Sequence, residues 1–311
     1  MENIKVENEV KMKKKETMAE LSLVLVSMIW GCGFIATEYV IEANWGTSLI
    51  MAVRFLIAAI TMIIVLNKKI LKLTKYELLH GSISGILLFL GFYTQTMGQS
   101  VTTVSNSAFF TATNVVMVPF ISWIINRRKP QIHTVMFTFI ALAGVGVLSF
   151  KGGKFSLSAG DLIVLLCAFF FAMQITYLEK ATKGSNPARV NFVQILTAAM
   201  ISLIVYIIKG EGIQNANIPQ GTLPILFLGI LSTCLCYFLQ TNAQKYSSAT
   251  KVGVILSMEG FFGGLFSVVL GMEALTVNLV LGGTLIIGAT VLMNIDFKSF
   301  AKKDETSYGT E

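Results

Sequence analysis

Apolar residues fall into ten long runs along this chain of 311 residues, separated by short polar segments. A helix that crosses a bilayer needs about 20 largely apolar residues, and each run has roughly that length. None of the runs alternates apolar and polar residues with a period of two, as the strands of a membrane barrel do. The pattern therefore predicts an all-α membrane protein with ten transmembrane helices. The runs cover residues 21–40, 47–66, 79–98, 104–125, 133–150, 161–179, 190–208, 222–243, 251–271 and 276–295.

The basic residues support this count, because they gather on one side of the predicted membrane. Of the 24 Lys and Arg residues, 20 lie in the head, the tail and every second loop. The loops on the opposite side hold only Lys151, Lys154 and Lys209, and Arg54 lies inside a run. Lys and Arg are enriched in cytoplasmic loops. We therefore expect a multi-pass protein of the cytoplasmic membrane with both termini in the cytoplasm.

Composition excludes several classes of function. Only 13% of the residues are charged and 54% are hydrophobic, whereas an average soluble protein is about 25% charged. A soluble enzyme or a nucleic-acid-binding protein is therefore not expected. The net charge of +7 reflects orientation in the lipid bilayer, and the connections between runs are too short to hold an extramembrane domain.

A short motif occurs twice, once in each half of the chain. The segment QTMGQ at 95–99 recurs as QTNAQ at 240–244, a shift of 145 residues, and VRFLIAA at 53–59 matches VQILTAA at 193–199, a shift of 140. Matches in the same order at a nearly constant shift predict two repeats of five helices each. The expected segments are a charged cytoplasmic head (1–20), a first repeat (21–150), a second repeat (151–296) and a cytoplasmic tail (297–311).

Five is an odd number, so the second repeat must enter the membrane with the opposite orientation. Repeats of opposite topology are related by a pseudo-two-fold axis in the membrane plane, and they characterise secondary transporters. Their substrate site lies near the midplane, between the halves. Two nearly equivalent packings, exchanged between the halves, would produce inward-open and outward-open states of similar free energy. The pattern thus favours a transporter that works by alternating access.

Several motifs resemble the ten-helix EamA-type transporters of the drug/metabolite transporter superfamily. They are WGCGF at 30–34, Arg54-Phe55, and LSMEG at 256–260 followed by GME at 271–273. Gly260 stands where that family usually has proline, which leaves a kink there unsupported. The resemblance covers about residues 20–296. It implies transport without ATP hydrolysis, typically the export of amino acids or related metabolites, and it does not identify the substrate.

Two ionisable residues lie inside the runs, where a charge is costly. Glu259 lies near the midplane and is either a protonatable coupling site or partner of a substrate amine, or a carboxyl group that locks helix packing. Arg54 lies about 10 Å below the outer end of its helix, at 1.5 Å per residue. It either reaches the outer surface, pairs with Glu38 or Glu42, or binds an anion.

The repeated Gln motif offers two interpretations. Gln95 and Gln99 share a helical face, and so do Gln240 and Gln244. The two motifs lie near opposite ends of the bundle, where they act either as mirror-related gates or as interhelical hydrogen bonds. Other polar and aromatic residues inside the runs suit a substrate with hydrogen-bonding and apolar parts. The candidate substrate-binding residues are Trp30, Tyr93, Gln95, Gln99, Asn114, Gln174, Tyr177 and Gln240.

Other kinds of site are not indicated. The four cysteines lie within runs, so no disulfide is demanded, and His80 and His133 lie at helix ends, so neither a metal site nor a cofactor is expected. The chain has no P-loop motif for ATP and no nucleophile–base set for an enzyme. Export of an amino acid or related metabolite is the leading function. Uptake of an aromatic vitamin such as riboflavin is the alternative, and a channel or intramembrane enzyme is less favoured. Protons are a candidate coupling ion. Both a monomer and a homodimer are compatible with the sequence.

Overall fold

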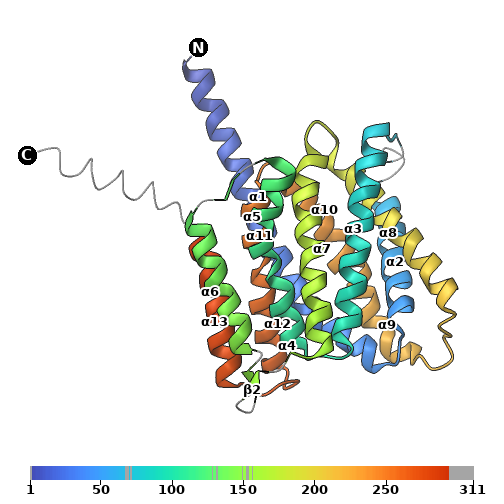
Figure 1. The fold of residues 1–311 in the computed structure, drawn as a ribbon. Helices are drawn as coiled ribbons and strands as arrows, with labels where there is room; N and C mark the ends of the chain where they lie inside the picture. The colour runs from blue at the N-terminus through green and yellow to red at the C-terminus, as the bar shows by residue number, and fades with distance from the viewer. Residues whose placement is uncertain are drawn as a thin grey trace, which may run out of the picture.

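A computed structural model describes residues 2–66, 70, 72–127, 129–130, 132–148, 150–151, 154–155 and 157–293. The expected tail at 297–311 lies outside the described residues, as do Lys68, Lys69 and Arg128. The described chain is a helical bundle with one short antiparallel hairpin between its halves (Figure 1).

The first half of the chain contains six helical segments. They are α1 (Glu2–Glu42), α2 (Thr47–Leu66), α3 (Lys75–Gln99), α4 (Val104–Ala112), α5 (Asn114–Asn126) and α6 (Ile132–Leu148). The hairpin strands β1 (Phe150–Lys151) and β2 (Lys154–Phe155) follow. The second half consists of α7 (Ala159–Thr182), α8 (Pro187–Lys209), α9 (Ile218–Phe227), the π-helix η2 (Leu228–Leu235), α10 (Cys236–Ala243), α11 (Ala249–Leu256), α12 (Met258–Val269) and α13 (Val277–Met293).

Together these segments form the ten expected helical spans. Eight stretches are long and apolar enough to cross a membrane, and the shorter apolar helices at Val135–Leu148 and Val277–Ala289 complete the ten. The prediction of ten helices is confirmed. It did not foresee that three spans are interrupted: α4 and α5 form one, α9, η2 and α10 another, and α11 and α12 a third.

Local capping explains where several helices begin. Thr74 and Glu77 form a capping box at the start of α3, and Ser158 and Asp161 form another at the start of α7. Each side chain accepts a hydrogen bond from a backbone N–H that has no partner within the helix. Asn186 caps α8, which begins at Pro187, a position where proline loses no hydrogen bond.

Two spans break near their middle at a hydroxyl residue. The Thr113 hydroxyl donates to the Phe110 carbonyl (2.6 Å) between α4 and α5, and the Ser257 hydroxyl donates to the Val254 carbonyl (2.7 Å) between α11 and α12. A side chain bonded to the preceding turn competes with the helical ladder and bends helices. The break at Ser257 lies three residues before Gly260, so this helix is interrupted without the proline.

A different irregularity interrupts the span of α9, η2 and α10. Pro224 lies inside α9 and offers no backbone N–H, and the π-helical segment η2 begins four residues later. The N–H of Cys236 bonds to the carbonyl of Leu231, five residues back. Short π-helical segments are rare in proteins, and a large share of those that occur lie at functional sites.

The packing of the helices repeats when the two halves are exchanged. In the centre, α3 packs on α7 and α8, while the span of α9, η2 and α10 packs on α1 and α2. Likewise α1 packs on α12, and α7 packs on α4 and α5. The helices α6 and α13 pair at one edge of the bundle (Figure 1).

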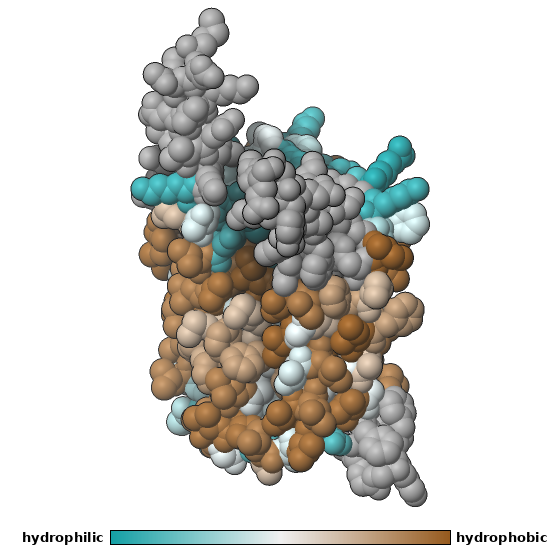
Figure 2. Space-filling view, turned by 90° about the vertical axis from the view of Figure 1, so that its left-hand side faces the viewer, coloured by the Kyte–Doolittle hydropathy of each residue, from teal (hydrophilic) through white to brown (hydrophobic). Residues whose placement is uncertain are grey.

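The surface separates into an apolar flank and a polar end. Figure 2 shows a brown hydrophobic side and teal hydrophilic side chains gathered at the end from which α1 projects. We call this the basic end. Its basic residues include Lys14, Lys15, Lys75, Lys180, Lys183, Arg189, Lys245 and Lys251.

Candidate functional site

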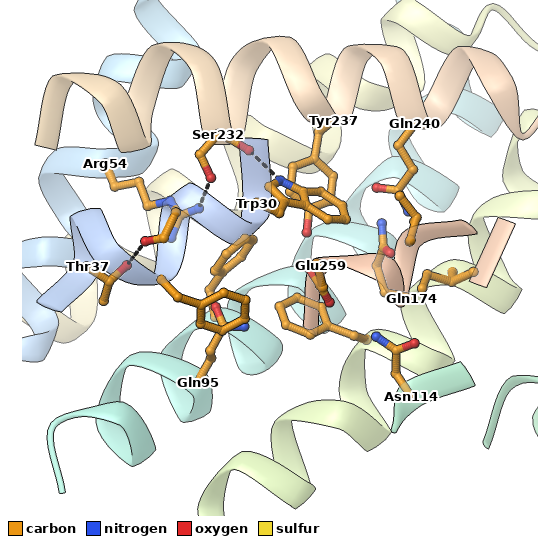
Figure 3. Close-up of a pocket in the computed structure, with 16 residues that line it drawn as sticks. Trp30, Thr37, Arg54, Gln95, Asn114, Gln174, Ser232, Tyr237, Gln240 and Glu259 are labelled. Atoms are coloured by element: carbon orange, nitrogen blue, oxygen red, sulfur yellow. Dashed lines mark hydrogen bonds between the residues drawn. The ribbon is translucent and has the colours of Figure 1, made fainter. Parts of the chain in front are cut away.

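A cavity lies between the helices, and both halves of the chain line it (Figure 3). Asn114 and Glu259 each lie ten residues after the first residue of their spans, Val104–Asn126 and Ala249–Val269. At 1.5 Å per residue this is about 15 Å, half the thickness of a bilayer core. The cavity is lined by Trp30, Gly33, Phe34, Thr37, Arg54, Phe92, Gln95, Asn114, Phe171, Gln174, Ile175, Ser232, Tyr237, Gln240, Leu256 and Glu259.

Most of the lining residues come in pairs, one from each half. Trp30 and Phe171, Gly33 and Gln174, and Phe34 and Ile175 are each 141 residues apart. A second group of pairs is separated by 145 residues. It consists of Phe92 and Tyr237, Gln95 and Gln240, and Asn114 and Glu259. Each half therefore contributes a similar wall to the cavity.

Arg54 projects from α2 into this cavity and is only 2% exposed. Its Nε donates to the hydroxyl of Thr233 (2.7 Å) and its Nη2 donates to the hydroxyl of Ser232 (3.0 Å), both on η2. The guanidinium carbon lies 3.9 Å from the ring centroid of Phe92, so one face of the group rests on an aromatic ring.

The structure excludes two of the roles expected for Arg54. The side chain does not reach the surface, and within the described residues no carboxylate oxygen lies within 4.0 Å of it. Glu38, one of the expected partners, instead accepts a hydrogen bond from Gln99 (3.0 Å). The Arg54 side chain points into the cavity and not toward the outer end of α2. Its depth along the helix therefore did not predict its partners.

Glu259 is the second residue of α12 and is 5% exposed. Figure 3 shows its carboxyl group in the middle of the cavity. Among the described residues it has no hydrogen-bond partner and no salt bridge. A buried carboxyl group without a partner is costly in a membrane protein and is a functional-site hypothesis by default.

Aromatic rings form one wall of the cavity. Trp30 and Tyr237 lie with ring centroids 5.1 Å apart, and Phe92 meets Tyr237 at 5.8 Å and Phe171 at 5.1 Å. The indole N–H of Trp30 donates to the Ser232 carbonyl (2.8 Å), so the same π-helical residue holds both Trp30 and Arg54. This wall can contact the apolar part of a bound molecule.

Amide side chains line the remaining surface. Gln240 is fully buried, and neither its amide nitrogen nor its amide oxygen has a hydrogen-bond partner within the described part of the chain. The side-chain oxygen of Asn114 is in the same state, whereas Gln95 donates to Thr111 (3.2 Å). Buried polar groups without partners are costly, so Gln240 and Asn114 are available to a polar ligand.

Three of the expected substrate-binding residues lie elsewhere. Tyr93 contacts Phe89, and the Lys209 ammonium lies 5.6 Å from its ring centroid. The Tyr177 hydroxyl forms a hydrogen bond with the His80 ring (2.5 Å).

Gln99, the third, holds two helices together. Its amide nitrogen donates to the Phe34 carbonyl (2.8 Å), which joins α3 to α1. Gln244, the residue after α10, does the same in the other half, where its amide nitrogen donates to the Ile175 carbonyl (2.7 Å) of α7. Of each predicted Gln pair, the first member therefore lines the cavity and the second bonds a neighbouring helix.

A buried hydrogen-bond network behind the cavity was not anticipated. The Gln194 side-chain oxygen accepts from Gln174 (2.8 Å) and from the Ser84 hydroxyl (2.5 Å), and the Gln194 amide nitrogen donates to Asn191 (3.0 Å). The sequence pointed to Gln194 only as the repeat partner of Arg54. Polar residues at similar depths in neighbouring apolar runs could have indicated this network, and they could also have indicated Ser232.

Comparisons with known proteins agree with this architecture. The model of the EamA-like transporter family matches residues 17–150 and 158–295. An uncharacterized transporter from Archaeoglobus fulgidus is 29% identical over 282 residues, which cover 90% of this chain and 87% of the relative. The uncharacterized transporter YoaV from Bacillus subtilis is 25% identical over 86% of this chain and 93% of its own. One crystal structure shares the fold with a TM-score of 0.67 at 17% identity, over 92% of this chain and 99% of that chain.

Proposed function

This chain belongs to the EamA-like transporter family, and we propose that it is a secondary transporter that moves a small organic metabolite through the central cavity by alternating access. As a member of that family it is a multi-pass membrane protein and a transporter rather than an enzyme. The observation that carries the proposal is the cavity itself. It lies at mid-membrane depth, both halves line it, and it contains Arg54 and Glu259 without a salt bridge between them.

Matching contacts in the two halves support alternating access. Gln99 bonds the Phe34 carbonyl and Gln244 bonds the Ile175 carbonyl, and both carbonyls belong to cavity-lining residues. Gln99 ends α3 far from the basic end, whereas Gln244 follows α10 at the basic end. We call these two hydrogen bonds the glutamine latches. An inverted repeat needs an equivalent contact at each end if the two ends are to open in turn.

Close helix contacts repeat in the same manner. A Cβ at Gly85 would lie 2.5 Å from the Gln194 carbonyl oxygen and 2.7 Å from the Cβ of Thr197. A Cβ at Gly229 would lie 3.1 Å from the Arg54 carbonyl oxygen and 2.7 Å from the Cβ of Ile57. Gly85 and Gly229 are 144 residues apart, and their contact partners are 140 apart in both cases. These paired contacts support two homologous halves with boundaries near 21–150 and 151–296.

Charge supports one orientation of the bundle. The basic end carries Lys14, Lys75, Lys180 and Lys245, and basic loops are retained in the cytoplasm. The proposed transporter therefore lies in the cytoplasmic membrane with both termini inside. Substrate direction then depends on the gradients, because inverted halves allow movement both ways.

The cavity favours export of an amino acid or related metabolite. It combines one guanidinium, one carboxyl group, four amides and an aromatic wall, which together match a small molecule with polar and apolar parts. Uptake of an aromatic vitamin such as riboflavin remains the second candidate, because the rings of Trp30, Phe92 and Tyr237 suit a flat aromatic ligand. A vitamin riboswitch upstream of the gene would support that alternative.

The direct test is transport by the purified protein in liposomes. Labelled amino acids and vitamins are screened with and without an imposed proton gradient. Saturable flux of at least one compound is expected. Failure of every compound to move contradicts the proposal, and flux that does not saturate indicates a channel.

A further inference from the structure

Two polar contacts join the halves of the chain at opposite ends of the bundle. At the basic end, the Lys251 ammonium on α11 lies 2.5 Å from a carboxylate oxygen of Glu20 on α1. At the other end, where the hairpin of β1 and β2 lies (Figure 1), the Asn106 side chain on α4 donates to the Asp161 carboxylate on α7 (3.0 Å). We call this second end the hairpin end.

The internal repeat relates these two contacts residue by residue. Glu20 and Asp161 are 141 residues apart, which is the shift between the cavity residues of α1 and α7, and Asn106 and Lys251 are 145 apart, which is the shift between Asn114 and Glu259. Asn106 and Lys251 are each the third residue of their helix, and the backbone N–H of each donates to the hydroxyl that caps it. The same contact is therefore present twice, once at each end of the bundle.

Both contacts lie between the cavity and one end of the bundle. Glu20 precedes Trp30 by ten residues and Asp161 precedes Phe171 by ten, and both aromatic residues line the cavity. Ten residues of helix span about 15 Å. The helices α1 and α11 pack together, as do α7 and α4. Access to the cavity from the basic end requires the first pair of helices to part, and access from the hairpin end requires the second pair to part.

The contact at the basic end is an exposed ion pair. The Lys251 ammonium also lies 3.0 Å from a carboxylate oxygen of Glu16, which lies one turn before Glu20 on α1. The exposed fraction of the side chain is 43% for Lys251 and for Glu16, and 31% for Glu20. Exposed ion pairs contribute little free energy, and salt screens them. We call Glu16, Glu20 and Lys251 the basic-end triad.

The contact at the hairpin end is buried. Asp161 is 1% exposed, and its Oδ1 accepts hydrogen bonds from the Asn106 amide (3.0 Å) and the Thr102 hydroxyl (2.5 Å). Its Oδ2 accepts from the backbone N–H of Ser158 (2.9 Å). Hydrogen bonds to a carboxylate are about twice as strong as bonds between neutral groups, and buried groups are screened much less by salt. We call Thr102, Asn106 and Asp161 the hairpin-end triad.

From this arrangement we infer that the two triads are the gates of the transporter and that they differ in strength. The basic-end triad closes the cavity toward the basic end through an ion pair that salt weakens, whereas the hairpin-end triad closes the opposite end through buried hydrogen bonds. The protein without substrate therefore opens more readily toward the basic end. The six residues are not among those that line the cavity, so they act on which end opens. The inference rests on the proposed alternating access and goes beyond it by assigning the gates.

Labelling of a cysteine in the cavity measures the opening of each end without knowledge of the substrate. In a protein without its native cysteines, Leu256→Cys lies five residues beyond Lys251 on α11, and Thr37→Cys lies on the hairpin side of Trp30 on α1. A membrane-impermeant maleimide is applied to intact cells or to inside-out vesicles. Reagent on the side of the basic end reports opening there through Leu256→Cys, and reagent on the other side reports opening of the hairpin end through Thr37→Cys.

Removal of the ion pair tests the basic-end gate. Lys251→Gln should raise the labelling rate of Leu256→Cys about threefold, because exposed ion pairs contribute less than about 1 kcal/mol each. An increase in salt from about 0.05 to about 0.5 M should raise the wild-type rate about twofold and leave the Lys251→Gln rate unchanged. Lys245→Gln removes an exposed charge from the same end and is the matched control.

Charge reversal separates loss of the ion pair from damage to the fold. Lys251→Glu places three carboxylates together and should raise the Leu256→Cys rate further than Lys251→Gln does. Addition of Glu16→Lys and Glu20→Lys restores opposite charges and should return the rate to that of the wild type. A combined variant that labels as fast as Lys251→Glu overturns the basic-end gate, as does an equal salt response in wild type and Lys251→Gln.

Loss of the interhelical amide tests the hairpin-end gate. Asn106→Ala leaves the capping box of Ser158 and Asp161 in place and should raise the Thr37→Cys rate about tenfold, since a hydrogen bond to a charged group is lost. Salt should change this rate little, because the contact is buried. Ser100→Ala removes an exposed hydroxyl that bonds its own helix and is the control. An Asn106→Ala protein with the wild-type rate overturns this gate.

Flux in liposomes distinguishes these outcomes from failure of the proposed function. Saturable flux by the wild type, together with labelling rates that none of the variants changes, overturns the gates and leaves the transporter. Absence of flux for every compound contradicts the transporter. Saturable flux together with the opposite responses of the two ends supports both.

Discussion

Arg54 and Glu259 line one cavity, and no salt bridge joins them. Arg54 is held by the neutral hydroxyls of Ser232 and Thr233, and Glu259 has no protein partner among the described residues. Two opposite charges inside a bilayer would be less costly if they neutralised each other. Their separation is therefore easier to explain by a molecule or ion that enters between them than by helix packing.

The first prediction concerns coupling through Glu259. If its carboxyl group carries a proton through the membrane, Glu259→Gln should abolish the acceleration of transport by an imposed proton gradient. Exchange of substrate at equal pH should persist, although more weakly. The measurement is flux in liposomes with and without the gradient. Glu42→Gln, an exposed carboxylate at the end of α1, is the matched control, and a Glu259→Gln protein that still responds fully to the gradient rules out this role.

The second prediction concerns the two glutamine latches. Gln99→Ala removes the bond to the Phe34 carbonyl and should favour the state open away from the basic end, whereas Gln244→Ala removes the bond to the Ile175 carbonyl and should favour the opposite state. Each lost bond is worth about 1 kcal/mol, or roughly fivefold in the ratio of the two states.

Labelling by a membrane-impermeant maleimide measures these shifts. In a protein without its native cysteines, Thr37→Cys reports access from one end of the cavity and Leu256→Cys reports access from the other. Gln220→Ala is the control, because the Gln220 side chain is exposed, and it should leave both labelling rates unchanged. Shifts in the same direction for both latch variants would contradict the mirrored gates.

The third prediction concerns close packing at two glycines. A Cβ at Gly85 would lie 2.5 Å from the Gln194 carbonyl oxygen, and one at Gly229 would lie 2.6 Å from the Cγ2 of Ile57. Alanine at either position should destabilise the protein by about 1–3 kcal/mol, because helices must move apart. Gly146→Ala meets nothing within 4 Å and should leave Tm unchanged or raise it. Equal Tm values for all three variants would show that these contacts are not tight.

The fourth prediction concerns orientation. Lys245→Cys, on the basic end, should react with an impermeant maleimide only after the cells are opened, whereas Gln214→Cys, in the loop after α8, should react in intact cells. The reason is the enrichment of Lys and Arg in cytoplasmic loops. Reversal of the two labelling patterns would place both termini outside.

The glutamine motifs illustrate how far sequence reasoning reached into the site. Gln95 and Gln99 share a helical face, and both were expected to act in the same way. Four residues span about 6 Å along a helix, which is enough to move the side chain from the cavity to the backbone of a neighbouring helix. Gln95 therefore lines the cavity while Gln99 bonds the Phe34 carbonyl. Tyr93 and Tyr177 were also expected in the site but lie outside the cavity lining. Their depth in the membrane does not determine the direction in which a side chain points.

The sequence by itself determined the ten helical spans and the duplicated motifs, because burial in hydrocarbon depends on local runs of apolar residues and duplication leaves its trace in the order of residues. Only the tertiary structure decided what shares the cavity. Arg54 and Glu259 are 205 residues apart, and their relation depends on how α2 and α12 pack against η2 and α1. The same packing decides the interruptions at Thr113 and Ser257 and the π-helix η2. A hydroxyl side chain can bond a carbonyl of its own helix or a group on a neighbouring helix, and the arrangement of the neighbouring helices determines which bond forms.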